Sequence, residues 1–248
     1  MVRCALFTSA TLAALSAALP LIGGFPAQAA DPGSNGPYLR AFGGYSLLEQ
    51  PSIQGDNITN GSTGNGTGRG SLSTSGGFWG GAAGGYHWGV FRLEGMGSYE
   101  SHSLGAFDSP QFSYVDTGGR RHTDLNAHPS LSGDLRIFTG FLNAVLDVKF
   151  GSAFEPFIGG GVGFAHVTMS DVTGSSNGNA FKLTDSSDTV LAFQALAGFA
   201  YRFTPTFAAE LGYRFVTLND PSFKDNLGGS FDLGIEGHQA WLGLRVDF

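Results

Sequence analysis

The sequence predicts an all-β protein, and within that class an eight-stranded antiparallel up-and-down transmembrane β-barrel. Three observations lead to this prediction. Apolar and polar side chains alternate along several segments, which marks strands. The connections between these segments alternate between short and long, which is typical of a meander of neighbouring strands. After residue 30, no apolar run reaches the length of a transmembrane helix, about 18 residues.

Composition excludes several other classes. The chain has 248 residues with 40 glycines, 13% aromatic residues, 13% charged residues, one cysteine and a net charge of −7. Glycine is well above its usual share of about 7%, and the aromatic content is too high for a disordered chain. The acidic balance is not that of a nucleic-acid binder, so we expect no nucleic-acid partner. A single cysteine excludes a disulfide scaffold.

Residues 1–29 have the pattern of a cleaved signal peptide. Arg3 precedes an apolar stretch from Ala5 to Leu19, and the small residues Ala27 and Ala29 form a cleavage site. The apolar stretch is shorter than the roughly 20 residues that span a bilayer. We therefore predict an exported protein whose barrel domain is residues 30–248. Without Arg3, the 13 basic residues become 12 against 20 acidic ones, a charge of −8, and the only cysteine is removed.

The last segment of the chain shows the strand pattern most clearly. Ala240, Leu242, Leu244, Val246 and Phe248 alternate with polar residues, glycine and a tryptophan. The same criterion predicts eight strands in all, at Tyr38–Leu48, Phe78–Trp88, Val90–Tyr99, Leu135–Phe150, Pro156–Thr168, Leu191–Phe203, Phe207–Thr217 and Asp232–Phe248. Tight turns are expected at 89, 151–154 and 204–206, and long polar loops at 49–77, 100–134, 169–188 and 218–237.

The composition of the two strand faces indicates which one meets lipid. One face carries large apolar side chains, with aromatic residues near the strand ends. The other carries glycine and only one or two charges per strand, which is too sparse for a water-exposed surface but suits a narrow interior. The alternative, a soluble barrel with the apolar face inside, is therefore disfavoured.

Several segments then carry a family resemblance. Phe91–Gly95, Glu155–Gly163, Leu211–Phe215 and Leu242–Phe248 resemble the eight-stranded outer-membrane β-barrels of Gram-negative bacteria, the group of opacity-type and porin-like surface antigens. The resemblance implies a location in the bacterial outer membrane, in contact with its lipid. It also implies that the last strand is the signal read by the barrel-assembly machinery, here Leu242, Leu244, Val246 and Phe248.

Charged residues on the presumed inner face form the candidate site. Eight strands give an interior that side chains just fill, and buried charges must be paired. We therefore predict a lumen charge network with a structural role, in which Arg40, Glu210, Arg214 and Arg245 are neighbours. The full set is Arg40, Arg92, Glu94, Asp147, Lys149, Arg202, Glu210, Arg214 and Arg245.

Catalytic and metal sites find weaker support. His166 and Ser170 lie near one end of a predicted strand and Glu155 at the other, too far apart for a triad. His102, His122 and His128 share a predicted loop with three aspartates, but their spacing matches no metal-binding motif. We expect no enzyme, no metal and no cofactor.

Three functional classes remain. The first is a structural or adhesion-type surface barrel, with a filled lumen and four long extracellular loops for contact with a host or a ligand. The second is a narrow porin-like channel for small solutes or ions, and the third is a lipid-modifying enzyme. Barrel size favours the first, because eight strands leave little room for an aqueous path. Conductance of the refolded protein would separate the first two.

Overall fold

The computed structural model describes residues 35–49, 52–59, 65–115, 121–124, 130–148, 153–176, 179–224 and 230–248. The predicted signal peptide, residues 1–29, lies outside these ranges, and so does Lys149. All regular structure in the described ranges is β-strand. No helix in them is long and apolar enough to cross a membrane.

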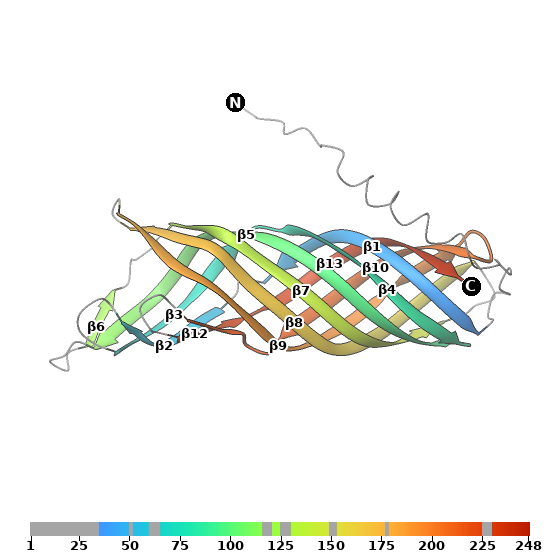
Figure 1. The fold of residues 1–248 in the computed structure, drawn as a ribbon, viewed down its shortest axis with the longest axis horizontal. Coiled ribbons are helices and arrows are strands. Elements are labelled where there is room, and N and C mark those ends of the chain that lie inside the picture. Colours follow the sequence, from blue (N-terminus) through green and yellow to red (C-terminus); the bar gives the residue numbers. More distant parts are fainter. Residues whose placement is uncertain are drawn as a thin grey trace, which may run out of the picture.

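Eight long strands close into an antiparallel barrel in the part of the chain that the structure describes, which confirms the predicted fold class. They are β1 (Gly36–Leu48), β4 (Gly77–Trp88), β5 (Phe91–Val115), β7 (Ser130–Asp147), β8 (Phe154–Ser176), β9 (Asn179–Arg202), β10 (Phe207–Leu218) and β13 (Glu236–Asp247). They pair in chain order, and β13 pairs with β1 to close the barrel. The strands run obliquely to the long axis (Figure 1).

The two ends of the barrel differ. At the turn end, where β1 begins and β13 ends, Gly89 joins β4 to β5 with a φ of 64°, a left-handed conformation that favours glycine. The opposite end, the loop end, lies at the left of Figure 1. It carries five further strands, β2 (Ser52–Thr59), β3 (Asn65–Thr74), β6 (Arg121–Asp124), β11 (Ser222–Lys224) and β12 (Ser230–Gly234).

The four predicted long loops are largely strand, which corrects the sequence-based prediction. β5 continues to Val115 and β8 to Ser176, and β2 and β3 form a hairpin between β12 and β5. The glycine, serine and asparagine of these segments are typical of loops, but pairing with neighbouring strands overrides local propensity. The barrel wall therefore continues into a loop-end tier, made of β2, β3, β6, β11, β12 and the adjoining ends of β5, β7, β8 and β9.

The predicted strand Asp232–Phe248 is also corrected, because it is two strands. Ile235 separates β12 from β13. β13 lies in the barrel wall, whereas β12 pairs with β2, for example at Leu233↔Ile53. The final part of the chain thus contributes to both the barrel wall and the loop-end tier.

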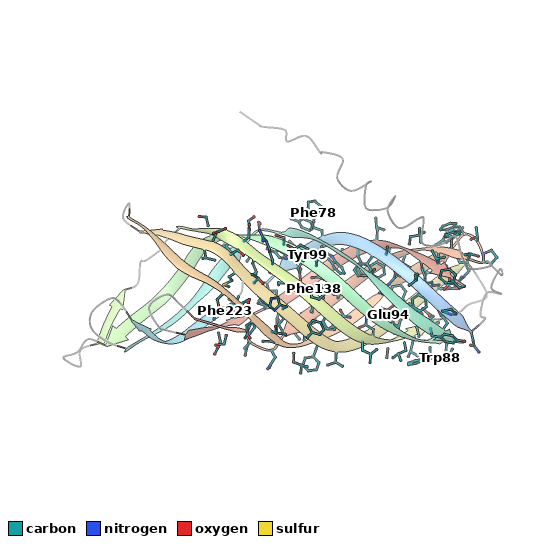
Figure 2. The ribbon with its side chains drawn as sticks, viewed as in Figure 1. Phe78, Trp88, Glu94, Tyr99, Phe138 and Phe223 are labelled. Atoms are coloured by element: carbon teal, nitrogen blue, oxygen red, sulfur yellow. The ribbon has the colours of Figure 1, made fainter. Side chains whose placement is uncertain are left out.

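Side chains alternate between lumen and outer surface along the barrel strands. On β10, Ala208, Glu210, Gly212 and Arg214 are buried, while the residues between them are exposed. Leu211 on the outer surface is 53% exposed, an arrangement that suits lipid and not water. Figure 2 shows the aromatic residues Phe78 and Trp88 at different positions along the barrel axis, with Trp88 nearer the turn end. Aromatic side chains on the loop-end side include Tyr45, Phe78, Tyr99, Phe138, Phe164 and Tyr213, and on the turn-end side Trp88, Phe91, Phe154, Tyr201 and Phe207.

Candidate functional site

The lumen is filled in layers, and the layer nearest the turn end is charged. Glu210 on β10 accepts hydrogen bonds from Arg245 Nη1 at 2.9 Å, Arg92 Nη1 at 3.5 Å and Arg40 Nη1 at 3.3 Å. These four residues are at most 4% exposed. An unpaired charge in such surroundings is strongly unfavourable, so the carboxylate and the three guanidinium groups depend on one another.

Glu94 on β5 is a second acceptor in the same layer. It accepts hydrogen bonds from Arg40 Nη2 at 2.7 Å, Tyr38 Oη at 2.6 Å and Asn143 Nδ2 at 3.0 Å. Arg40 therefore bridges Glu94 and Glu210. Because these residues come from four different strands, their contacts fix the strands across the lumen as well as along the wall.

Closer to the turn end, Arg202 and Arg245 share the carboxylates of Glu155 and Asp247. Arg202 Nη1 lies 2.7 Å from Asp247 Oδ2, and Arg202 Nε lies 3.2 Å from Glu155 Oε1. Arg245 Nη2 lies 3.1 Å from Glu155 Oε2. These ion pairs join the start of β8 and the end of β9 to the end of β13.

Asp147 and His87 complete this layer. Asp147 lies 2.8 Å from Arg92 Nε, and the His87 ring lies 3.6 Å from Asp147 and 3.2 Å from Asp247. We call the set the turn-end charge cluster; in the described residues it consists of Arg40, Arg92, Arg202, Arg245, His87, Glu94, Asp147, Glu155, Glu210 and Asp247. Four guanidinium groups thus face five carboxylates, with the imidazole between two of the carboxylates.

An aromatic layer follows toward the loop end. Phe42 is the next inward residue after Arg40 on β1, and Met96 the next after Glu94 on β5. The layer consists of Phe42, Trp79, Met96, Phe141, Leu196 and Trp241. A Cβ at Gly212 would overlap the Trp241 indole, so the glycine lets this ring lie across the lumen.

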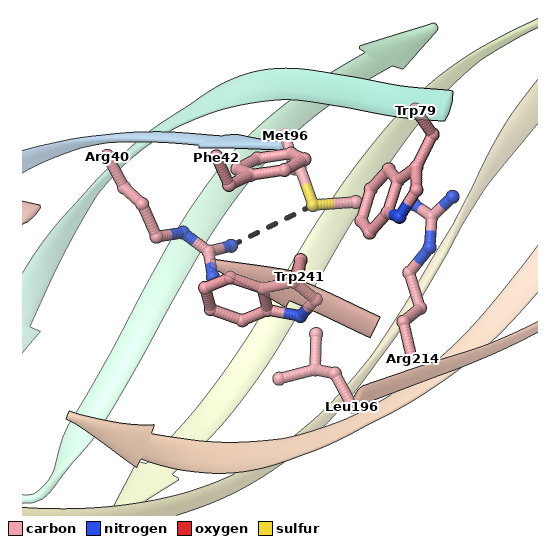
Figure 3. A pocket seen from close by; sticks show the side chains of 7 residues that line it. All are labelled: Arg40, Phe42, Trp79, Met96, Leu196, Arg214 and Trp241. Atoms are coloured by element: carbon pink, nitrogen blue, oxygen red, sulfur yellow. Dashed lines mark hydrogen bonds between the residues drawn. The ribbon is translucent and has the colours of Figure 1, made fainter. Parts of the chain in front are cut away.

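Figure 3 shows a small cavity within this layer, with Arg40 on one side and Arg214 on the other. Its volume is about 10 Å³, room for one water molecule. The Arg40 guanidinium lies 4.7 Å from the centre of the Trp241 ring, and that of Arg214 lies 4.2 Å from the centre of Trp79. Both contacts are cation–π interactions, which help to keep the two cations in an apolar layer.

Arg214 belongs to a separate polar layer. It donates hydrogen bonds to Ser98 Oγ at 3.3 Å, to Gln194 Oε1 at 3.2 Å and to Gln239 Oε1. It forms no ion pair with a carboxylate of the described residues. The structure therefore brings Arg40, Glu210 and Arg245 together as the sequence predicts, but it places Arg214 on the far side of the aromatic layer.

Glu100 is the carboxylate of this second polar layer. It accepts hydrogen bonds from Ser46 Oγ at 2.7 Å and Gln239 Nε2 at 2.8 Å, and it lies 3.0 Å from His102 Nε2. His102 was expected in a solvated loop, which is wrong. Because β5 is longer than predicted, this side chain points into the lumen and is 1% exposed.

The layer nearest the loop end is apolar. It contains side chains from the barrel strands and from the loop-end tier, among them Leu135 and Phe223, each 0% exposed. Further members are Leu104, Ile137, Val167, Met169, Val172, Val216, Leu218, Leu233 and Ile235. The lumen of the described part is thus filled from end to end, by charged, aromatic, polar and apolar layers in turn.

The remaining predicted residues lie as follows. His166 faces outward on β8 and bonds to Thr189 Oγ1 at 2.8 Å, while Glu155 is buried in the turn-end charge cluster. His128 and the side chain of His122 lie outside the described residues. The described residues contain no group of three or more potential metal ligands.

Some lumen residues escaped the sequence analysis. Tyr38 and Asn143 bond to Glu94, Gln239 bonds to Arg214, and Glu100 accepts from Gln239, yet none of the four was among the predicted set. The alternation of inward and outward side chains could have identified them, because each occupies an inward position of its strand. Tyr38, Asn143 and Gln239 carry no charge, and Glu100 lies just beyond the predicted end of its strand at Tyr99.

Of the predicted assembly signal, Leu242, Leu244 and Val246 lie on β13, and Phe248 directly follows it. Leu242 and Leu244 are exposed to the outside, at 68% and 37%, and Val246 is partly buried. The backbone N–H of Phe248 donates a hydrogen bond to Pro37 O on β1, the strand with which β13 closes the barrel, at 3.0 Å.

A closed antiparallel barrel with an apolar exterior and a charged interior defines a class, the β-barrels of bacterial outer membranes. The chain belongs to the family described as "Outer membrane protein beta-barrel domain", whose profile matches residues 17–248. It is therefore a protein of the bacterial outer membrane, as the resemblance implied.

The chain is similar to solved structures of other outer-membrane proteins. The outer membrane protein OprG from Pseudomonas aeruginosa superimposes with a TM-score of 0.55 at 14% identity, over 86% of this chain and 96% of that one. Neisserial surface protein A gives a TM-score of 0.46 at 16% identity, over 87% and 99%. The attachment invasion locus protein Ail of Yersinia pestis gives 0.37 at 14% identity, over 86% and 99%. No curated protein matches the sequence.

Proposed function

We propose that this protein is a structural surface barrel, whose filled lumen anchors and stiffens a loop-end tier that faces the outside of the cell. The observation that carries the proposal is the succession of buried layers in the lumen, from Glu210 through Trp241 and Glu100 to Phe223. Such layers favour a rigid support over an aqueous path. The loop-end tier would then supply the surface for contact with a host or a ligand.

Orientation and assembly belong to the same proposal. Barrels of this class have short turns on the periplasmic side and longer connections outside, so the loop-end tier would be extracellular. β13 would act as the signal for the barrel-assembly machinery, with Leu242, Leu244, Val246 and Phe248 recognised before the barrel closes. Lipid of the outer membrane would cover the apolar exterior.

A narrow channel is the second candidate. It is favoured by one observation, the cavity of about 10 Å³ beside Arg40 and Arg214. Arg214, which forms no ion pair with a carboxylate of the described residues, lies next to this unfilled space, and an anion pathway would use such a cation. Against it stand the layers on both sides of this cavity.

Planar-bilayer recording of the refolded protein tests the proposal. We expect little steady conductance, because buried side chains fill every layer of the lumen. An open porin of larger strand number, reconstituted in the same way, is the positive control. Stable openings of the wild-type barrel would contradict the filled lumen, and a change of their ion selectivity in Arg214→Gln would favour the channel.

A further inference from the structure

Three polar side chains form a chain of hydrogen bonds on the outer surface of the barrel. Tyr213 Oη lies 2.5 Å from His238 Nδ1, and His238 Nε2 lies 2.8 Å from Glu49 Oε1. They come from β10, β13 and the residue that follows β1. All three are accessible: Tyr213 is 46% exposed, and the side chains of His238 and Glu49 are 37% and 58% exposed. The Phe215 ring, 5.3 Å from that of His238, packs beside the imidazole.

The register places this group at the loop-end edge of the lipid-facing surface. Tyr213 pairs with Ala240, which pairs with Tyr45. Tyr45 and Tyr213 both belong to the aromatic side chains on the loop-end side of the outer surface, which form an aromatic girdle. His238 lies further toward the loop end, and the backbone N–H of Glu49 donates to Glu236 O beyond it. The phenol therefore lies at the height of the aromatic girdle, where acyl chains meet headgroups, and the carboxylate lies on the aqueous side.

The hydrogen bonds determine what each group can do. An ionised carboxylate only accepts, so His238 Nε2 carries a hydrogen that it donates to Glu49. The other nitrogen of a neutral imidazole is then an acceptor, and the Tyr213 hydroxyl donates to it. A hydroxyl bonded to a histidine that an acid orients is the arrangement of an activated nucleophile.

We propose that Tyr213, His238 and Glu49 form a catalytic site that hydrolyses acyl esters of outer-leaflet lipids. Tyr213 Oη bonds to the ester carbonyl carbon while its proton passes to His238 Nδ1. The C–O bond to the alcohol then breaks, and His238 returns the proton to that oxygen. Water attacks the acyl-tyrosine in a second round with the same proton transfers, which releases the fatty acid and restores Tyr213. Glu49 stabilises the imidazolium in both rounds.

The choice of an ester follows from position and charge. Ester linkages of membrane lipids lie at the interface, at the height of Tyr213. Glu49 makes the site electronegative, which disfavours an anionic phosphate but not an uncharged carbonyl. The proposal goes beyond the structural role above and does not depend on it, since this site is on the outer wall and the lumen is not involved.

The test uses the refolded mature barrel in two kinds of vesicle. One contains phosphatidylethanolamine and phosphatidylglycerol, and the other contains the same lipids with lipopolysaccharide added. Released fatty acid is measured by mass spectrometry, and the arm that supports release identifies the lipid. We expect release by the wild type, a loss of about 100-fold or more in Tyr213→Phe and His238→Gln, and a smaller loss in Glu49→Gln.

Matched controls exist on the same surface. Tyr45→Phe changes a phenol at the same height, and His166→Gln changes an outward histidine bonded to Thr189, so both should keep the wild-type rate. Heat-modifiable migration verifies that each variant is folded. In addition, rapid quenching of the wild type should yield a peptide acylated at Tyr213. Absence of release in both arms, or equal release by Tyr213→Phe, would overturn the proposal.

Discussion

At the scale of single residues, alternation predicts which side chains face the lumen but not which of them meet. The eight described residues of the predicted charge network lie on the inner face. Arg214, however, lies beyond the aromatic layer from Glu210, because it is four residues further along β10 toward the loop end. The Tyr213–His238–Glu49 group was missed for a related reason: its partners are 25 and 189 residues apart. Strand stagger and long-range pairing decide such contacts.

The first prediction at this scale concerns Glu210. Glu210→Ala removes the one carboxylate that three buried guanidinium groups share. Loss of one partner of a buried charge cluster costs about 3–5 kcal/mol, so the unfolding midpoint in urea should fall clearly. The measurement is the tryptophan fluorescence of the barrel in lipid vesicles during urea titration.

Asp134→Ala is the matched control for this prediction. Asp134 pairs with Arg136 at 3.4 Å, but both side chains are about half exposed, at 49% and 48%. An exposed ion pair contributes roughly 0–1 kcal/mol, so this variant should unfold near the wild-type midpoint. Equal shifts for both variants would mean that the lumen contacts of Glu210 add nothing beyond a surface pair.

At the scale of elements, the sequence predicts the membrane part of each strand well and its outer part poorly. The lipid-facing alternation from Phe207 to Thr217 corresponds to β10, Phe207–Leu218. β5, in contrast, was expected to end at Tyr99 and continues to Val115. The sequence of its outer part has no apolar stripe of the kind that faces lipid, so the composition of this part resembles that of a loop. It is a strand because it pairs with β3 and β7.

The prediction at this scale concerns Phe223 of β11. Its side chain is 0% exposed within the loop-end apolar layer, and Phe223→Ala would leave a cavity there. Replacing a buried phenylalanine by alanine lowers the free energy of unfolding by about 3–5 kcal/mol. Here the loss would destabilise the loop-end tier, which extends beyond the bilayer. Trypsin should therefore cleave after Lys224 faster in Phe223→Ala than in wild-type barrels in vesicles.

Phe138→Ala serves as the comparison. Phe138 is 47% exposed on the outside, where lipid fills the space that the ring leaves. Cleavage after Lys224 should stay at the wild-type rate in this variant. If Phe223→Ala were also cleaved at the wild-type rate, the loop-end tier would not depend on its buried aromatic side chain.

At the scale of the whole molecule, closure joins the last strand to the first. β13 pairs with β1 from Tyr38↔Asp247 to Leu48↔Gly237, and with β10 on its other side. The number of long barrel strands was predictable, and so was the position of the start of β1 and the end of β13 at the turn end, because short and long connections alternate. The loop-end tier was not, because β12 pairs with β2 across most of the chain length.

The last prediction concerns Phe248 and separates recognition from stability. Phe248 follows β13, and its backbone N–H donates a hydrogen bond to Pro37 O on β1. Deleting Phe248 should therefore leave the urea midpoint of the refolded barrel nearly unchanged, since the pairing of β13 with β1 remains. In cells, the amount of heat-modifiable barrel in the outer membrane should fall severalfold, while export and cleavage after Ala29 continue. Wild-type amounts after the deletion would show that assembly does not read this residue, whereas a large loss of stability in vitro would assign it a purely structural role.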